Sequence, residues 1–322
     1  MATPTKTAAR TPLTIKNSSD MKGAFLVALL FLTLAAESST STLIYVSDYF
    51  SFVGADQHGR VAFALDNNRG RDGEAFQAEH FVVLHDEQDG WMDVAGNGPY
   101  DNLEKELDRI PDSPFFQFTG APEAGLTISS TQNQLTLRID PIPLRHQRTE
   151  SNSRLWMGSA SAVLTWQGRT LRGRVIYEHL AMLDFNRLTR TYFGLWNEFQ
   201  GLYLLLDGTG DVYLHSQQSE RLEPVSGKLV GFAVMNEATD YLNDLDVTVV
   251  NREFALGFYR WPTEWRITWR GNKGPASMTL SLSERKGIAN WVLGGFSMGI
   301  VRGQLSYDGR TWPLYGLAEL LM

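Results

Sequence analysis

The stretch AVLTWQGRTLRGRVIYEHL, Ala162–Leu180, decides the expected fold, because a similar stretch returns as QLSYDGRTWPLYGLAEL, Gln304–Leu320. A shift of 141 positions aligns the two without a gap, and Gly168, Arg169 and Glu178 fall on identical residues. Each copy reads as a strand, a tight turn at the glycine and a second strand that ends on a glutamate. The repeat predicts two similar β-units in tandem, the alternative being that two hairpins resemble one another by chance.

The composition fits a globular β-protein. The chain has 322 residues, enough for two domains, with 43% hydrophobic and 20% charged residues. It has no cysteine, which excludes disulfides, thiolate metal sites and cysteine nucleophiles. The six histidines are scattered, so neither a metal nor another cofactor is expected. The net charge of -7 and the lack of a basic stripe argue against a nucleic-acid partner.

Residues 1–40 are expected to form a leader outside the fold. Met1–Asp20 has no apolar period and is predicted to be disordered. The apolar run Gly23–Ala36 is shorter than the roughly 20 residues that span a bilayer. With Lys16 and Lys22 ahead of it, the run is typical of a signal-peptide core and predicts an exported, periplasmic or membrane-associated protein. A retained membrane anchor and a buried N-terminal strand or helix are the alternatives.

The rest of the chain predicts an all-β protein. Strand patterns recur about every ten residues with turn signals between them, which is typical of a sandwich or barrel. We expect an N-terminal β-domain over residues 41–185 and a C-terminal one over residues 186–322. The segment NNRGRDG, Asn67–Gly73, is expected to be a turn or exposed loop, and Asn102–Asp108 is the one plausible short helix of the N-terminal half. The chain has no GxGxxG, P-loop, GxSxG or HExxH motif.

Two Glu-His pairs lie inside predicted strands, Glu79-His80 and Glu178-His179. Because successive strand residues point to opposite faces, only one member of each pair can face a barrel interior. A buried glutamate or histidine is costly unless it is paired or takes part in chemistry, and a histidine can serve as general acid or base near neutral pH. Outward-facing, solvated side chains are the alternative.

Further candidates are one aspartate and several aromatic residues. Asp207 ends an apolar strand before a Gly-Thr-Gly turn, where an ordinary turn aspartate is the alternative. Trp91, Trp196 and Tyr203 are core residues in one interpretation and line an apolar ligand pocket in the other.

The second half of the chain resembles the carotenoid 1,2-hydratase (hydroxyneurosporene synthase) and AttH-like family. The resemblance covers Trp156–Met322 and rests on WQGRTLRGRVIYEHL, FQGLYLLLDGTG and the closing YDGRT…YGLAEL. It implies two tandem lipocalin-like, calycin-like antiparallel β-barrels with few short helices. It also implies water addition to a terminal isoprenoid C=C bond, in which an acid forms a tertiary carbocation that water then quenches.

The resemblance also places site residues. On its pattern His179 and Asp207 match the polar positions implicated in the hydratases, while Ala181 and Leu205 stand where a tryptophan and a tyrosine are expected. The predicted catalytic residues are His179, Asp207 and Glu178, and the predicted substrate-binding residues are Tyr203, Trp196, Trp91, His80 and Glu79.

Three functions remain open. The first is an enzyme that acts on a long apolar, isoprenoid- or carotenoid-type substrate by acid-assisted hydration or cyclisation, in an apolar pocket between or within the barrels. The second is an exported, non-catalytic protein that binds lipids or other hydrophobic ligands. The third is a β-protein that works through its surface.

Overall fold

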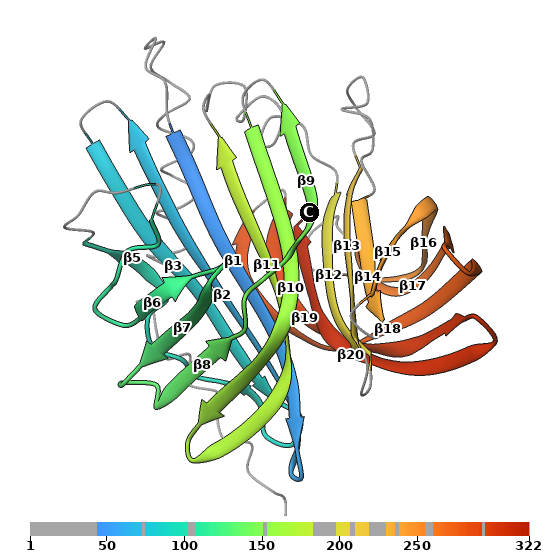
Figure 1. The fold of residues 1–322 in the computed structure, drawn as a ribbon, viewed down its shortest axis with the longest axis horizontal. Coiled ribbons are helices and arrows are strands. Elements are labelled where there is room, and N and C mark those ends of the chain that lie inside the picture. Colours follow the sequence, from blue (N-terminus) through green and yellow to red (C-terminus); the bar gives the residue numbers. More distant parts are fainter. Residues whose placement is uncertain are drawn as a thin grey trace, which may run out of the picture.

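The computed structural model describes residues 44–72, 75–101, 107, 109–150, 153–182, 198–206, 210–218, 230–235, 238–254, 260–291 and 294–321. These residues contain strands and turns but no helix, and the strands form two curled antiparallel sheets, each a half-barrel (Figure 1). The predicted all-β class with two lipocalin-like units is confirmed. The leader 1–40 and all of the predicted helix except Leu107 lie outside the described residues.

The first sheet has the strand order β4-β3-β2-β1-β11-β10-β8-β7-β6, with β5 paired to β3 and β9 paired to β10. Its strands are β1 (Ile44–Asp56), β2 (Gly59–Asp72), β3 (Ala75–Asp86), β4 (Gly90–Met92), β5 (Gly98–Tyr100), β6 (Gln117–Ala121), β7 (Gly125–Ser130), β8 (Leu135–Ile139), β9 (Leu144–Glu150), β10 (Ser153–Trp166) and β11 (Arg169–Met182).

The second sheet has the strand order β15-β14-β13-β12-β20-β19-β18-β17-β16. Its strands are β12 (Glu198–Leu206), β13 (Gly210–Gln218), β14 (Val230–Met235), β15 (Ala238–Tyr241), β16 (Asn243–Phe254), β17 (Arg260–Gly271), β18 (Gly274–Trp291), β19 (Gly294–Tyr307) and β20 (Arg310–Leu321). The predicted boundary between residues 185 and 186 falls in the segment 183–197, outside the described residues.

The two repeated stretches form matching hairpins at matching places in the two sheets. Hairpin β10–β11 pairs with the first strand of its sheet, β1, and hairpin β19–β20 pairs with β12 in the same way. Gln167 and Gly168 have φ angles of 48° and 80°, and Asp308 and Gly309 have 50° and 69°. Positive φ at both central residues is the hallmark of the two-residue type I′ turn that joins twisted strands.

The register across the two hairpins is also the same. Met157 stands opposite Glu178, and Met298 stands opposite Glu319, again at a shift of 141 positions. The equivalence therefore extends beyond the quoted repeat, toward the beginning of the first strand of each hairpin.

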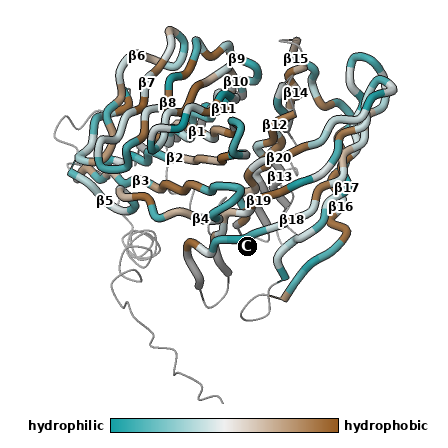
Figure 2. Tube along the Cα trace, turned by 90° about the horizontal axis from the view of Figure 1, so that it is seen from below, coloured by the Kyte–Doolittle hydropathy of each residue, from teal (hydrophilic) through white to brown (hydrophobic). Residues whose placement is uncertain are grey.

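Three hydrophobic cores hold the fold together. One fills the curl of the first sheet, one fills the curl of the second, and the third lies between the sheets. Strand alternation assigns residues to cores, so Phe50 of β1 enters the first curl while its neighbour Tyr49 enters the space between the sheets. In that space β1 and β11 lie next to β12, β13 and β20 (Figure 2).

The prediction of a turn or loop at Asn67–Gly73 is wrong for Asn67–Asp72, and Gly73 lies outside the described residues. Strand β2 continues to Asp72 and stays paired with both neighbours, as in Asn67 opposite Asp48 and Arg71 opposite Phe76. Asn67 and Arg69 are fully buried inside the first curl. Their side chains find polar partners there, which offsets the cost of burying them in a strand.

Candidate functional site

Consecutive side chains of β11 point into two different spaces. Glu178 faces the space between the sheets, whereas His179 faces the interior of the first half-barrel, as their hydrogen bonds to Tyr213 and Asp48 show. Glu79, next to Asp66, and His80, next to Asn67, divide between the same two faces of β3. The structure therefore does not bring the predicted catalytic residues Glu178 and His179 into one site.

Four carboxyl groups gather between the sheets, and we call them the inter-sheet acid cluster. They are Asp66 on β2, Glu79 on β3, Glu178 on β11 and Glu319 on β20, all half-buried. The charge of Asp66 acts on each of the other three, and that of Glu178 acts on Glu319. Half-burial leaves these groups within reach of a ligand while removing much of their hydration.

Their environment favours the protonated form. Burial is the largest cause in every case, and the neighbouring carboxylates add to it. Together these effects raise the pKa of Asp66 to about 6, of Glu79 and Glu178 to about 7, and of Glu319 to about 8. A carboxylic acid that keeps its proton near neutral pH can donate it, and partners with different pKa values can divide the roles of acid and base.

Tyrosines of the second sheet hold two of these carboxyl groups. The Tyr213 hydroxyl donates a hydrogen bond to Glu178 Oε2 at 2.6 Å, and the Tyr203 hydroxyl donates one to Glu319 Oε2 at 3.2 Å. The Tyr203 ring centroid lies 4.9 Å from that of Tyr49 and 5.3 Å from that of Tyr213. The predicted substrate-binding residue Tyr203 is a core residue between the sheets, in a buried group of aromatic rings, here called the aromatic wall, that connects the two glutamates.

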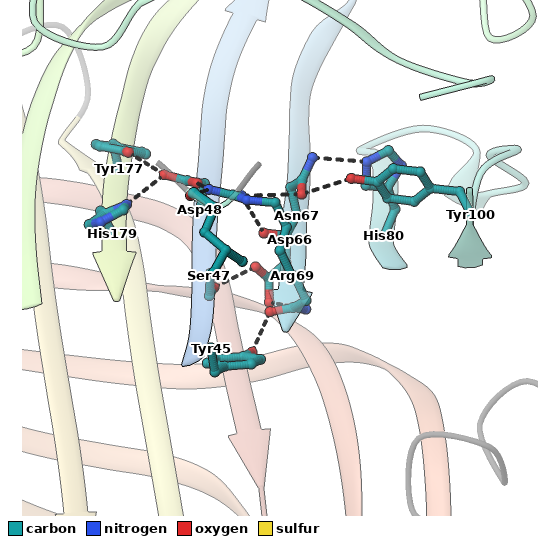
Figure 3. A network of polar contacts seen from close by, with 12 residues as sticks. Tyr45, Ser47, Asp48, Asp66, Asn67, Arg69, His80, Tyr100, Tyr177 and His179 are labelled. Atoms are coloured by element: carbon teal, nitrogen blue, oxygen red, sulfur yellow. Dashed lines mark hydrogen bonds and ion pairs between the residues drawn. The ribbon is translucent and has the colours of Figure 1, made fainter. Parts of the chain in front are cut away.

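The interior of the first half-barrel holds a second polar group, centred on Asp48 (Figure 3). His179 Nδ1 lies 2.8 Å from Asp48 Oδ1, which also accepts a hydrogen bond from Tyr177, and Arg69 Nη2 lies 2.7 Å from Asp48 Oδ2. Burial alone would raise the pKa of Asp48, but the hydrogen bond from His179, the charge of Arg69 and the hydrogen bond from Tyr177 outweigh it and lower the pKa. Asp48 is therefore ionised.

His80 lies on the same inner face, but its contacts are those of a buried structural residue. Its ring packs 4.3 Å from the Tyr100 ring, and Asn67 Nδ2 lies 3.1 Å from His80 Nε2. Burial, with the charge of Arg69, lowers the pKa of His80 to about 3. His80 is thus a neutral ring that accepts a hydrogen bond from Asn67.

The remaining predicted site residues lie elsewhere. Trp91 packs on His85, with ring centroids 5.0 Å apart, and Lys286 Nζ lies 6.0 Å from its ring centroid. Trp196 and Asp207 lie outside the described residues.

Sequence reasoning missed several residues of both groups. The sequence could have identified Glu319 as a site residue, because the repeat aligns it with Glu178. Asp48 carried a weaker signal, since it falls on the inward parity of β1, where the next inward residue is the apolar Phe50. Arg69 carried less, because its inward neighbour on β2 is the polar Asn67. Tyr213 carried none, because it meets Glu178 only through the packing of two sheets.

Within the described ranges, no three histidine, aspartate or glutamate side chains are grouped to hold a metal ion. A helix that could cross a membrane is likewise absent from this part of the chain.

Comparison with solved structures identifies the fold. The chain resembles an AttH-like protein of Nitrosomonas europaea with a TM-score of 0.57 and 11% sequence identity, over 86% of this chain and 92% of that one. It resembles CghA with a TM-score of 0.51 and 11% identity, over 86% and 88%. For kievitone hydratase of Nectria haematococca the TM-score is 0.48 and the identity 12%, over 90% and 91%.

The AttH-like part of the predicted resemblance is thereby confirmed at the level of fold. No protein-family model and no curated protein sequence matches the chain.

Proposed function

We propose that the protein is an enzyme that uses the inter-sheet acid cluster to protonate a carbon–carbon double bond of a long apolar, isoprenoid-type substrate. One observation carries the proposal. Glu178 and Glu319 stand at equivalent positions of the two hairpins, both are half-buried between the sheets, and both have a raised pKa.

The proposed step begins at Glu319, whose pKa of about 8 keeps it protonated at neutral pH. Its proton passes to one carbon of the double bond, so that the π bond breaks, a C–H bond forms and a tertiary carbocation remains. In hydration, a water oxygen bonds to the cation and a water proton passes to the Glu178 carboxylate. In cyclisation, a second double bond of the substrate attacks the cation, and the proton then lost goes to a carboxylate.

The surroundings suit a cationic intermediate in an apolar substrate. The rings of Tyr49, Tyr203 and Tyr213 form the aromatic wall, and Phe232 stacks on Tyr213 at 5.6 Å. Aromatic faces attract cations, by about 0.5–2 kcal/mol per contact. Carboxylates in a site of low polarity stabilise the same charge more strongly than they would in water.

The location of the protein and its partner follow from the same proposal. The signal-like run Gly23–Ala36 supports an exported or membrane-associated protein, which would meet long apolar molecules at or near a membrane. The partner is the apolar substrate itself.

Isotope incorporation tests the reaction. The protein is incubated with geranylgeraniol, a long polyprenyl alcohol, in heavy-oxygen water and separately in deuterated water, and the products are analysed by mass spectrometry. Hydration adds one heavy oxygen, and cyclisation adds deuterium without oxygen. Glu319→Gln should abolish both, Glu178→Gln should slow turnover, and the exposed Glu264→Gln should change nothing.

The acid itself is tested without substrate. Infrared difference spectra at neutral pH should show a protonated carboxyl band that is weaker in Glu319→Gln, because Glu79 and Glu178, with pKa values of about 7, keep only part of it. If that band is missing from the wild type, the proposed acid is wrong. If the band is present and geranylgeraniol binds without incorporating isotope, the non-catalytic ligand-binding function replaces the enzyme.

A further inference from the structure

A straight row of side chains crosses the inner face of the first half-barrel. The backbone register places Trp156 opposite His179, His179 opposite Asp48, Asp48 opposite Asn67, and Asn67 opposite His80, on five neighbouring strands. The row borders the apolar core of the first half-barrel, because the inward residue of β1 next to Asp48 is Phe50, which belongs to that core. A polar row at the rim of an apolar interior is the usual arrangement of a small-molecule site.

Asp48 fixes which nitrogen of His179 carries the hydrogen. An ionised carboxylate only accepts hydrogen bonds, so the contact from His179 Nδ1 to Asp48 Oδ1 requires a hydrogen on Nδ1. In its neutral form the ring then presents the lone pair of Nε2 at its other edge. Arg69 pairs with the Oδ2 atom of Asp48, and Tyr177 donates a second hydrogen bond to its Oδ1 atom. The carboxylate is therefore held in one orientation.

Exposure marks the end of the row that a ligand can reach. The side chain of Asp48 is 2% exposed and that of Arg69 is 0% exposed, whereas that of His179 is 30% exposed. Trp156, next to His179 in the row, is half-buried, and its ring packs edge-on against Tyr177 with centroids 4.9 Å apart. The accessible part of the row therefore consists of one hydrogen-bond acceptor beside one aromatic ring.

The repeated hairpin shows that the fold itself does not require this histidine. The position of β20 equivalent to His179 is Leu320, which is buried in the apolar core of the second half-barrel. The same backbone position is thus filled by a leucine in one copy, and by a histidine with a buried carboxylate and a buried guanidinium behind it in the other. Burying that set is costly, and a purely structural role would be served by the leucine.

We propose that Asp48, His179 and Trp156 form a second site that binds a flat ring bearing a weakly acidic hydroxyl group, such as a phenol or an enol. The hydroxyl donates to His179 Nε2, and the ring packs against Trp156. When the proton transfers, the O–H bond breaks, an N–H bond forms at Nε2, and the resulting oxyanion pairs with the imidazolium. The proton returns to the oxygen when the ligand leaves, so no other reactant is needed. The site is separate from the inter-sheet acid cluster, because it lies on the opposite face of β11.

The test uses para-nitrophenol, whose bound phenolate form is followed by its visible absorbance in titrations of the full chain at constant pH. His179→Gln keeps a polar side chain at a partly exposed position and should weaken binding about tenfold or more, the effect expected when a hydrogen bond to a charged group is lost. Trp156→Leu should weaken binding as well. Glu178→Gln alters the neighbouring residue on the other face and should leave binding unchanged.

A second measurement guards against variants that fold poorly. Nitrogen NMR of the histidine side chains in the wild-type protein, at a pH where the ring is neutral, should show the His179 hydrogen on Nδ1, with Nε2 gaining a proton when para-nitrophenol is added. Wild-type affinity in His179→Gln, or an Nε2 that does not respond to the probe, would overturn the proposal. An equal loss in Glu178→Gln would also overturn it, since binding would then belong to the space between the sheets.

Discussion

Glu178 and Glu319 occupy the same position in the two copies of one hairpin, and each accepts a hydrogen bond from a tyrosine of the second sheet. The duplication thus brings two copies of one carboxylic acid together, instead of keeping each in its own half-barrel. Burial is the largest cause of both raised pKa values, about 7 for Glu178 and about 8 for Glu319, and Glu319 also experiences the charge of Glu178. Two equivalent positions thus hold acids with unequal pKa values, which suits them to unequal roles.

The raised pKa of Glu319 predicts how stability depends on pH. The carboxyl group ionises near 4.5 in the unfolded chain but near 8 in the folded protein, so the free energy of unfolding should fall as pH rises between these values. Glu319→Gln removes this titration and should flatten that part of the profile, with a relative gain of a few kcal/mol above about pH 8, at ~1.4 kcal/mol per unit of pKa. Urea unfolding at a series of pH values measures the free energy of unfolding of both proteins. A wild-type profile that rises through this range would contradict the assignment.

The buried ion pair between Arg174 on β11 and Asp211 on β13 joins the two sheets. Arg174→Met leaves the Asp211 carboxylate without this partner and should lower the free energy of unfolding by about 3–5 kcal/mol. Adding Asp211→Leu should restore much of the loss, because both charges are then gone. Denaturant unfolding of the single and double variants gives the comparison. Additive losses would show that the two side chains do not act as a pair.

Gly316 allows β20 to approach β12 closely. A Cβ atom there would lie 2.0 Å from the carbonyl oxygen of Tyr203 and 2.8 Å from Leu204 Cα, so the backbone must shift. Gly316→Ala should cost about 1–3 kcal/mol of stability. It should also move Tyr203 away from Glu319. Thermal unfolding measures the loss of stability, and the infrared band of the Glu319 carboxyl group reports the change at the acid. A variant of unchanged stability would show that the strands have room for the methyl group.

The turn of the first hairpin can be improved. Gln167 has a φ of 48°, which glutamine adopts less readily than asparagine, and Gly168 follows at 80°. Gln167→Asn should raise stability by a few tenths to about 1 kcal/mol, whereas Gly168→Ala should lower it by about 1–2 kcal/mol. Thermal melts measure both changes. The same loss for both variants would argue against a type I′ turn.

Local patterns were sufficient to predict the all-β class and the tandem arrangement of two β-units. The repeat with its Gln-Gly and Asp-Gly turns predicted two hairpins, and strand alternation predicted that Glu178 and His179 diverge. The prediction failed at Asn67–Asp72, because it followed the intrinsic preference of asparagine and glycine for turns. In the structure, long-range pairing to β1 and β3 and the buried partners of Asn67 and Arg69 override that preference.

The site could be predicted only in fragments. Each partner of Glu178, Glu319 and His179 comes from another strand, and the contacts of Tyr203 and Tyr213 depend on how one sheet packs against the other. No spacing along the chain encodes that packing. Sequence reasoning could therefore name individual polar residues but not divide them between two faces.

Glu178 and His179 point to opposite faces of β11, because side chains alternate along a strand with a period of two residues. A deletion or insertion of one residue would send the acid into the first half-barrel and the imidazole between the sheets, and would remove both sets of chemistry at once. A change of two residues would keep each side chain on its own side. Natural variants of this protein should therefore tolerate length changes in β11 only in even steps.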